Sequence, residues 1–123
     1  MFKIKKLIRS FHHAFKGLAL IYREEQNFRI HVVCSCIVLF LAFLLRVEPL
    51  QIIILLITIS TLLILEIINT VFERLVDIAK PRVHHYIAFI KDVMAGGVLI
   101  AAVVCTLTTI IILFPYALNI IQS

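Results

Sequence analysis

The sequence predicts an all-α membrane protein, with an N-terminal amphipathic surface helix and three transmembrane helices in a single membrane domain over residues 1–123. Of the 123 residues, 63% are hydrophobic, and the mean hydropathy is +1.11. A soluble domain of this size has too much surface to hide that apolar fraction. Three apolar stretches approach or exceed the roughly 20 residues that a helix needs to cross the hydrocarbon core. The net charge of +5 comes from residues that flank these stretches, which indicates membrane topology rather than a nucleic-acid partner.

The first element is expected to be a helix over residues 2–23 that lies on the membrane surface. Its apolar residues recur at helical spacing with Lys and Arg between them: Phe2, Ile4, Leu7, Ile8, Phe11, Phe15, Leu18 and Tyr22. The segment has no compact apolar run followed by a small-residue cleavage site, so we do not expect it to be a secretory signal.

The three membrane spans are expected over residues 30–47, 50–65 and 93–114. Only "RVEP" separates the first two, so they should form an antiparallel hairpin with Pro49 in the first turn of the second helix. The second helix should continue to residue 77 and end at "AKPR", because Pro81 cannot continue it. His84 and His85 should then lie in a loop.

The distribution of basic residues predicts the orientation in the membrane. Seven of the twelve Lys and Arg lie in residues 1–29, four lie between the second and third spans, and only Arg46 falls on the other side. The positive-inside rule places the N-terminus in the cytoplasm and the C-terminus outside. The cysteines Cys34, Cys36 and Cys105 all lie in apolar stretches, so we expect small core residues rather than disulfides or zinc ligands.

The stretch "LEIINTVFERLVD", residues 65–77, places polar side chains at the edge of a membrane helix. At about 100° per residue, Asn69 lies about 60° from Glu66 around the axis, and Glu73 and Asp77 return to within about 20° of it. These four residues therefore form one narrow stripe. An ionisable group at the lipid boundary is a functional candidate by default, and aligned carboxylates tolerate one another best around cations.

Two further polar clusters should lie at the same membrane face: "YREEQNFRIH" at 22–31 and "IKDVMAGG" at 90–97. Carboxylate oxygens suit Mg²⁺ that is shared with phosphates, and a lysine suits a phosphate. A carboxylate at the lipid boundary can take a proton from a lipid hydroxyl. Together these groups predict phosphoryl transfer from a nucleotide to a lipid alcohol. The absence of a Walker A sequence and of a kinase Gly-rich loop excludes a soluble-kinase fold. For His31, a structural role and a role in the site remain equally open.

Four blocks of the sequence resemble the prokaryotic diacylglycerol kinase family, small membrane lipid kinases that include the undecaprenol kinases. The blocks are "FKGL" at 15–18, "EEQNFRIH" at 24–31, "EIINTVFERLVD" at 66–77 and "IKDVMAGGVLIAA" at 90–102. The resemblance covers about residues 10–115, and the pattern E-x-x-N-x-x-x-E-x-x-x-D on a membrane helix is specific. The second block is more similar to the undecaprenol-kinase branch.

This resemblance implies an ATP- and Mg²⁺-dependent phosphotransferase that acts on the primary hydroxyl of a membrane lipid. Glu66 matches the catalytic base and Asn69 the polar residue one turn on, and both face the lipid hydroxyl and the transferred phosphate. Glu25 and Glu73 match the carboxylates that hold Mg²⁺ together with ATP. Further matched positions belong to the ATP site: Gly17, Asp77, His84, Lys91 and Asp92.

The resemblance also implies a homotrimer in the bacterial inner membrane, with each site shared between protomers. The acceptor is expected to be diacylglycerol, which would give phosphatidic acid, with undecaprenol as the alternative. Phe89 departs from the family, because many relatives have a lysine there. A rival from another class is a small cation or proton transporter subunit with the carboxylate stripe as its path. A third alternative is a structural subunit of a membrane complex.

Overall fold

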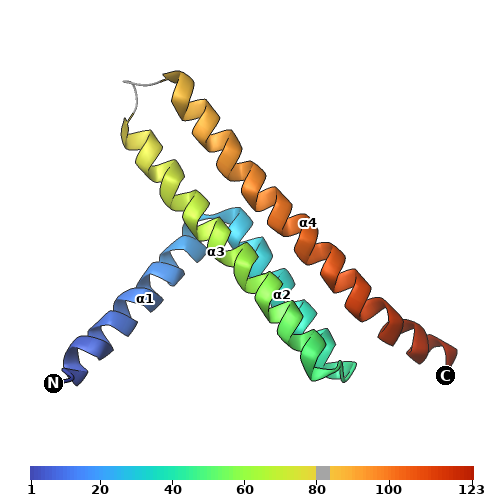
Figure 1. Cartoon of the computed structure of the whole chain (residues 1–123). Helices are drawn as coiled ribbons and strands as arrows, with labels where there is room; N and C mark the ends of the chain where they lie inside the picture. The colour runs from blue at the N-terminus through green and yellow to red at the C-terminus, as the bar shows by residue number, and fades with distance from the viewer. Residues whose placement is uncertain (80–83) are drawn as a thin grey trace.

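The computed structural model describes residues 1–79 and 84–123, which form four α-helices. These are α1 (Ile4–Glu24), α2 (Gln26–Leu44), α3 (Pro49–Ala79) and α4 (His84–Gln122). Helices α2, α3 and α4 are long and apolar enough to cross a membrane, so the predicted all-α membrane fold is confirmed. Figure 1 shows α3 and α4 side by side with opposite directions, α2 against α3, and α1 pointing away from this bundle.

Helix α1 forms close to the predicted bounds, and none of its residues is buried. Its apolar residues remain exposed, among them Phe11 at 59% and Phe15 at 69%. An amphipathic helix with an uncovered apolar face is typical of a helix at a membrane interface. The position of α1 on the membrane surface stays a prediction.

The turn between α2 and α3 explains why the first span ends earlier than predicted. The backbone N–H of Arg46 donates to the carbonyl of Phe43 (3.2 Å), and that of Val47 donates to the carbonyl of Ala42 (3.1 Å). This pair of bonds is a Schellman motif, with Arg46 at φ 53° in the left-handed position. Val47 turns back into the core and is 4% exposed. Helix α2 therefore ends at Leu44, not at residue 47, whereas α3 begins at Pro49 as predicted.

Helix α4 is longer than the predicted third span at both ends. It begins at His84, so the expectation that His84 and His85 lie in a loop is wrong. No Pro or Gly separates His84 from the apolar run, and the intervening segment, which contains the buried Ile87, extends the helix. The expected stop at Pro81 lies outside the described residues. At the other end α4 continues past residue 114 through Pro115, which membrane helices tolerate when neighbouring elements hold them.

Tyr116 holds the far end of α4 against the α2–α3 turn. Its hydroxyl donates to Oε1 of Gln51 (2.7 Å) and accepts from the backbone N–H of Glu48 (3.2 Å). The surrounding core contains Ala42, Val47, Leu55 and Ile112. Because Gln51 lies in the first turn of α3 and Glu48 directly precedes that helix, this cluster fixes one end of the three-helix bundle.

Of the three cysteines, only Cys105 is buried, in a second core cluster with Ile59 and Leu62. Cys34 and Cys36 are exposed, so their prediction as core residues is wrong. Both lie on α2, and Cys34 also lines a cavity between α2, α3 and α4. All three are free thiols.

The helix lengths decide where the polar clusters lie. At 1.5 Å per residue, α3 is about 46 Å long and α4 about 58 Å, against a hydrocarbon core of roughly 30 Å. The Tyr116 cluster fixes the end of the bundle at the α2–α3 turn. The part of α3 and α4 that exceeds the thickness of the hydrocarbon core therefore projects at the opposite end, towards Ala79 and His84. The junction of α1 and α2 meets α3 partway along this end (Figure 1).

Candidate functional site

Glu66 is the central residue of the site. It is 4% exposed and lies about 26 Å along α3 from Pro49, close to the boundary of a roughly 30 Å hydrocarbon core. Its Oε1 lies 3.1 Å from Nε2 of His31, which is on the neighbouring helix α2. Burial of a carboxylate without a partner costs several kcal/mol or more, and His31 supplies that partner.

The predicted polar stripe forms along α3, because the helix is continuous through Ala79. The side-chain amide of Asn69 donates from Nδ2 to Oε1 of Glu73, at 3.4 Å. The Asn69 Oδ1 atom is buried and has no hydrogen-bond partner in the part of the chain that the structure describes. The charges of Glu73 and Glu25 both act on the Glu66 carboxyl. The stripe and the α1–α2 junction therefore meet around Glu66.

Arg74 joins the α1–α2 junction to α3. Its Nη2 lies 2.8 Å from Oε2 of Glu24 and 3.2 Å from Oε1 of Glu25. Glu25 has extended backbone dihedrals and separates the two helices, which brings its side chain and that of Glu24 toward α3. In the sequence, Arg74 is one of the four basic residues between the second and third spans, and it was used only to predict the orientation in the membrane. Its contact with the α1–α2 junction was therefore not predicted.

Lys91 and Asp77 connect α3 to α4 at the projecting end. The Lys91 Nζ atom lies 2.7 Å from Oδ1 of Asp77, and the charge of Glu73 also reaches Lys91. This pairing brings two predicted ATP-site residues together and places them one helical turn beyond Glu73. Asp92, the neighbour of Lys91, is exposed on α4. The side chain of His84 lies outside the described part of the structure.

A cavity of about 640 Å³ opens between α1 and α3, within the usual range of small-molecule sites. Its polar lining includes Glu24, Glu25 and Arg74, and Gly17 of α1 faces it as well. A Cβ added at Gly17 would meet no atom within 4 Å, so the cavity keeps open space there. Two predicted ATP-site residues, Gly17 and Glu25, therefore line one cavity.

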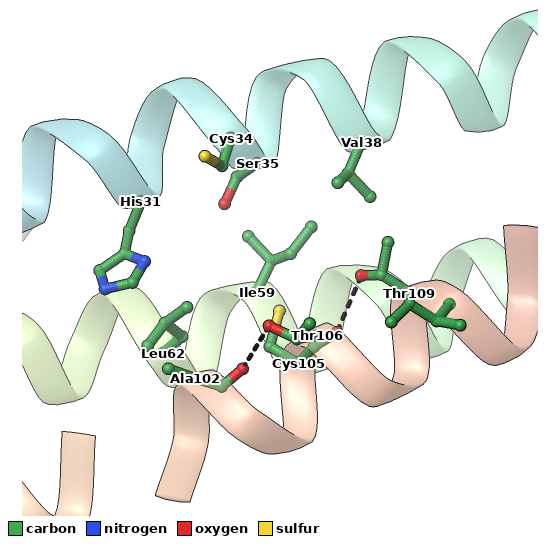
Figure 2. A pocket seen from close by; sticks show the side chains of 11 residues that line it. His31, Cys34, Ser35, Val38, Ile59, Leu62, Ala102, Cys105, Thr106 and Thr109 are labelled. Carbon is green, nitrogen blue, oxygen red and sulfur yellow. Dashed lines mark hydrogen bonds between the residues drawn. The ribbon is translucent and has the colours of Figure 1, made fainter. Parts of the chain in front are cut away.

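A second cavity, of about 320 Å³, lies between α2, α3 and α4 (Figure 2). His31 and Ser35 of α2 face it, opposite Ile59 and Leu62 of α3 and several residues of α4. The hydroxyls of Thr106 and Thr109 donate to carbonyls of their own helix, at 2.8 Å each, so they leave an essentially apolar lining. We call this cavity the interhelical cleft. His31 belongs both to the cleft and to the contact with Glu66.

Comparison with known proteins identifies the family. A sequence model described as "Prokaryotic diacylglycerol kinase" matches residues 12–113, most of the chain. The chain belongs to the prokaryotic diacylglycerol kinase family. The predicted resemblance is thereby confirmed, and the expected class, a phosphotransferase with an alcohol acceptor, agrees with this family.

Three curated relatives of this family illustrate the similarity. The chain is 34% identical to a diacylglycerol kinase of Synechocystis sp. over 92% of its own length, but spans only 65% of that protein. It is 30% identical to an undecaprenol kinase of Bacillus subtilis, over 92% of both chains. It is 27% identical to a diacylglycerol kinase of Escherichia coli, over 90% of this chain and 91% of the relative. A family of membrane lipid kinases, together with three candidate spans, makes this chain a multi-pass membrane protein.

The oxygen donors gathered by the fold fit the Mg²⁺ ion that a family of lipid kinases implies. Glu25, Glu73 and the unpartnered Asn69 Oδ1 are hard oxygen ligands of the type that Mg²⁺ prefers. Within residues 1–79 and 84–123, no group of three His, Cys, Asp or Glu lies close enough to hold a metal ion. Mg²⁺ commonly uses one or two carboxylates together with substrate phosphates and waters, so the chemistry of Glu25 and Glu73 is compatible with such an ion.

Proposed function

We propose that this protein is an ATP- and Mg²⁺-dependent lipid kinase that transfers the γ-phosphate to the primary hydroxyl of a membrane lipid. The observation that carries the proposal is the buried Glu66 carboxylate at the boundary of the apolar bundle, close to the charges of Glu25 and Glu73. A lipid hydroxyl reaches that depth from the bilayer, and a nucleotide reaches it from the projecting helix ends.

In this reaction one proton moves to Glu66 and one phosphoryl group moves to the lipid. Glu66 accepts the hydroxyl proton while the lipid oxygen forms a bond to the γ-phosphorus. The bond from that phosphorus to the oxygen bridging to the β-phosphate breaks, and ADP leaves. Asn69, one turn from Glu66, orients the hydroxyl and the transferred group.

The remaining residues have binding roles in this proposal. Glu25 and Glu73 hold Mg²⁺ with ATP; when bound, the metal neutralises charge on the β- and γ-phosphates. Lys91 contacts the phosphates as a point charge. The rest of the nucleotide site consists of Gly17, Asp77, His84 and Asp92.

The acceptor is a lipid alcohol with a long apolar body, and the interhelical cleft is the place for the part of that body nearest the hydroxyl. The cleft ends at His31, which contacts Glu66, so a chain lying in it presents its hydroxyl to the base. Since a water-sized group occupies about 30 Å³, a volume of about 320 Å³ holds roughly ten methylene-sized groups.

Diacylglycerol is the first acceptor that we propose, with phosphatidic acid as product. Undecaprenol is the second candidate acceptor, and two observations support keeping it as the alternative. The relative named undecaprenol kinase matches this chain over 92% of both lengths. The "RIH" block, which resembles that branch, supplies the histidine that contacts Glu66.

We further propose a homotrimer in the bacterial inner membrane, with the N-terminus in the cytoplasm and each site completed by a neighbouring protomer. The bias of Lys and Arg supports this orientation. Membership of a kinase family argues against the transporter and structural-subunit alternatives.

The proposal is tested with the purified protein in lipid, given γ-labelled ATP and Mg²⁺, and offered diacylglycerol and undecaprenol separately. We expect label in one or both lipids, and none when Mg²⁺ is chelated. ATP-independent ion flux in proteoliposomes, without lipid labelling, would instead support the transporter.

A further inference from the structure

We propose that His31 is a positioning residue for Glu66: its Nε2–H donates to Oε1 and holds the carboxylate so that Oε2 faces the lipid hydroxyl. This inference rests on the proposed kinase function and deepens it. The two side chains come from different helices, and the Nε2–Oε1 distance of 3.1 Å is within hydrogen-bonding range.

The surroundings of Glu66 leave His31 as its favourable polar contact. In the described residues, no other side chain forms an ion pair or a hydrogen bond with the Glu66 carboxylate. The other charged groups that act on it are Glu25, at the α1–α2 junction, and Glu73, on α3. Both carry the same charge as Glu66 and repel it, so within residues 1–79 and 84–123 only His31 provides a directed attraction.

Positioning matters here because a glutamate has three rotatable side-chain bonds. A general base acts efficiently only when its oxygen is within hydrogen-bond reach of the proton that it removes. Glu66 is held from one side by its own helix and from the other by His31, whose ring also lines the interhelical cleft (Figure 2). The ring therefore connects the carboxylate to the cleft that His31 lines.

The contact uses Nε2 rather than Nδ1, which allows a matched pair of substitutions. The terminal amide of glutamine reaches the position of Nε2, whereas that of asparagine reaches only the position of Nδ1. His31→Gln keeps a donor at the right distance, and His31→Asn keeps an amide at the wrong one. His31→Leu removes the donor while retaining apolar volume. His12→Asn, on the exposed α1, is the control for the substitution type.

We expect His31→Asn and His31→Leu to lower kcat about tenfold to a hundredfold, the range that a hydrogen bond to a charged group supports. The KM values for ATP and for the lipid should stay within about twofold. His31→Gln should keep at least a third of the wild-type kcat, and His12→Asn should not differ from wild type. This split between kcat and KM separates positioning from binding.

Three results would overturn the inference. One is wild-type kcat in His31→Leu, and another is an increase in the lipid KM alone, which would make His31 a wall of the cleft. The third is a His31→Gln variant as slow as His31→Asn. If wild type labels no lipid at all, the kinase function fails first and the role of His31 fails with it.

A spectroscopic measurement tests the pair without turnover. With ¹⁵N-labelled histidine, Glu66→Leu should shift the imidazole nitrogen resonances of His31 and leave those of His12 unchanged. An unchanged His31 spectrum would refute the hydrogen bond even if the protein phosphorylates lipid.

Discussion

The most decisive perturbation is Glu66→Gln, because it changes the charge of the proposed base and very little else. Glutamine has nearly the same shape, so the α3 core around the 4%-exposed position stays filled. The amide retains hydrogen-bonding capacity toward His31, which lies 3.1 Å from Oε1. The substitution also removes repulsion from Glu25 and Glu73. We therefore expect a change in the free energy of unfolding below about 1.5 kcal/mol, since one neutral hydrogen bond contributes about that much.

The effect on turnover should be far larger. A positioned general base typically contributes a factor of about 10² to 10⁴, so kcat should fall by at least a hundredfold. The assay is transfer of γ-labelled phosphate to lipid, together with nucleotide binding to the same preparation and thermal unfolding in detergent. Glu48→Gln, the same substitution beside the start of α3 at the opposite end of the bundle, is the matched control. Wild-type activity in Glu66→Gln, or a loss that follows an equal loss of folded protein, would refute the assignment.

Three further outcomes follow from the same geometry. Lys91→Met should raise the KM for ATP about tenfold, since a charge-assisted hydrogen bond to phosphate contributes about 1.5–3 kcal/mol; an unchanged KM would remove Lys91 from the nucleotide site. Ala102→Phe fills part of the interhelical cleft and should raise the lipid KM about tenfold, because displacing two lipid methylenes at about 0.8 kcal/mol each loses roughly that much affinity. Its control is Ala101→Phe, whose side chain enters a different α3–α4 cavity, and equal effects of the two would contradict the cleft as the lipid path. Tyr116→Phe removes the hydroxyl that bonds Gln51 and Glu48 and should lower the free energy of unfolding by about 1–2 kcal/mol. The same variant should keep the wild-type KM for ATP, because the nucleotide site lies at the other end of the bundle.

Features that depend on local periodicity were predictable from the sequence. The polar stripe needs only the helical repeat, and the continuous α3 forms it between Glu66 and Asp77. Pro49 at the start of α3 follows from its missing N–H and its fixed φ. The ends of α2 and α4 were less predictable. Arg46 adopts a left-handed conformation that glycine usually provides. Residues 84–92 precede the long apolar run of the third span, and α4 nevertheless begins at His84.

Features that depend on long-range contacts could not be predicted in the same way. Arg74 meets Glu24 and Glu25 across about 50 positions of sequence only because the helix breaks at Glu25. Lys91 meets Asp77 because α4 extends back along α3, which the predicted loop did not include. His31 had two equally open roles until the packing of α2 on α3 placed Nε2 beside Glu66. In each case the residue type was recognisable from the sequence, but the alignment of one helix against another, which decides the contact, was not.

That alignment is set a long way from the site. His31 lies about four turns before the end of α2, and Glu66 lies about five turns after the start of α3. The only covalent connection between them runs through the α2–α3 turn, where the Schellman bonds, buried Val47 and the Tyr116 hydroxyl fix how the two helices align. One residue inserted within α2, between the turn and His31, would rotate His31 by about 100° around the helix axis and move Nε2 away from Glu66. The conformation of a turn at one membrane face thus determines whether the proposed base is correctly held at the other.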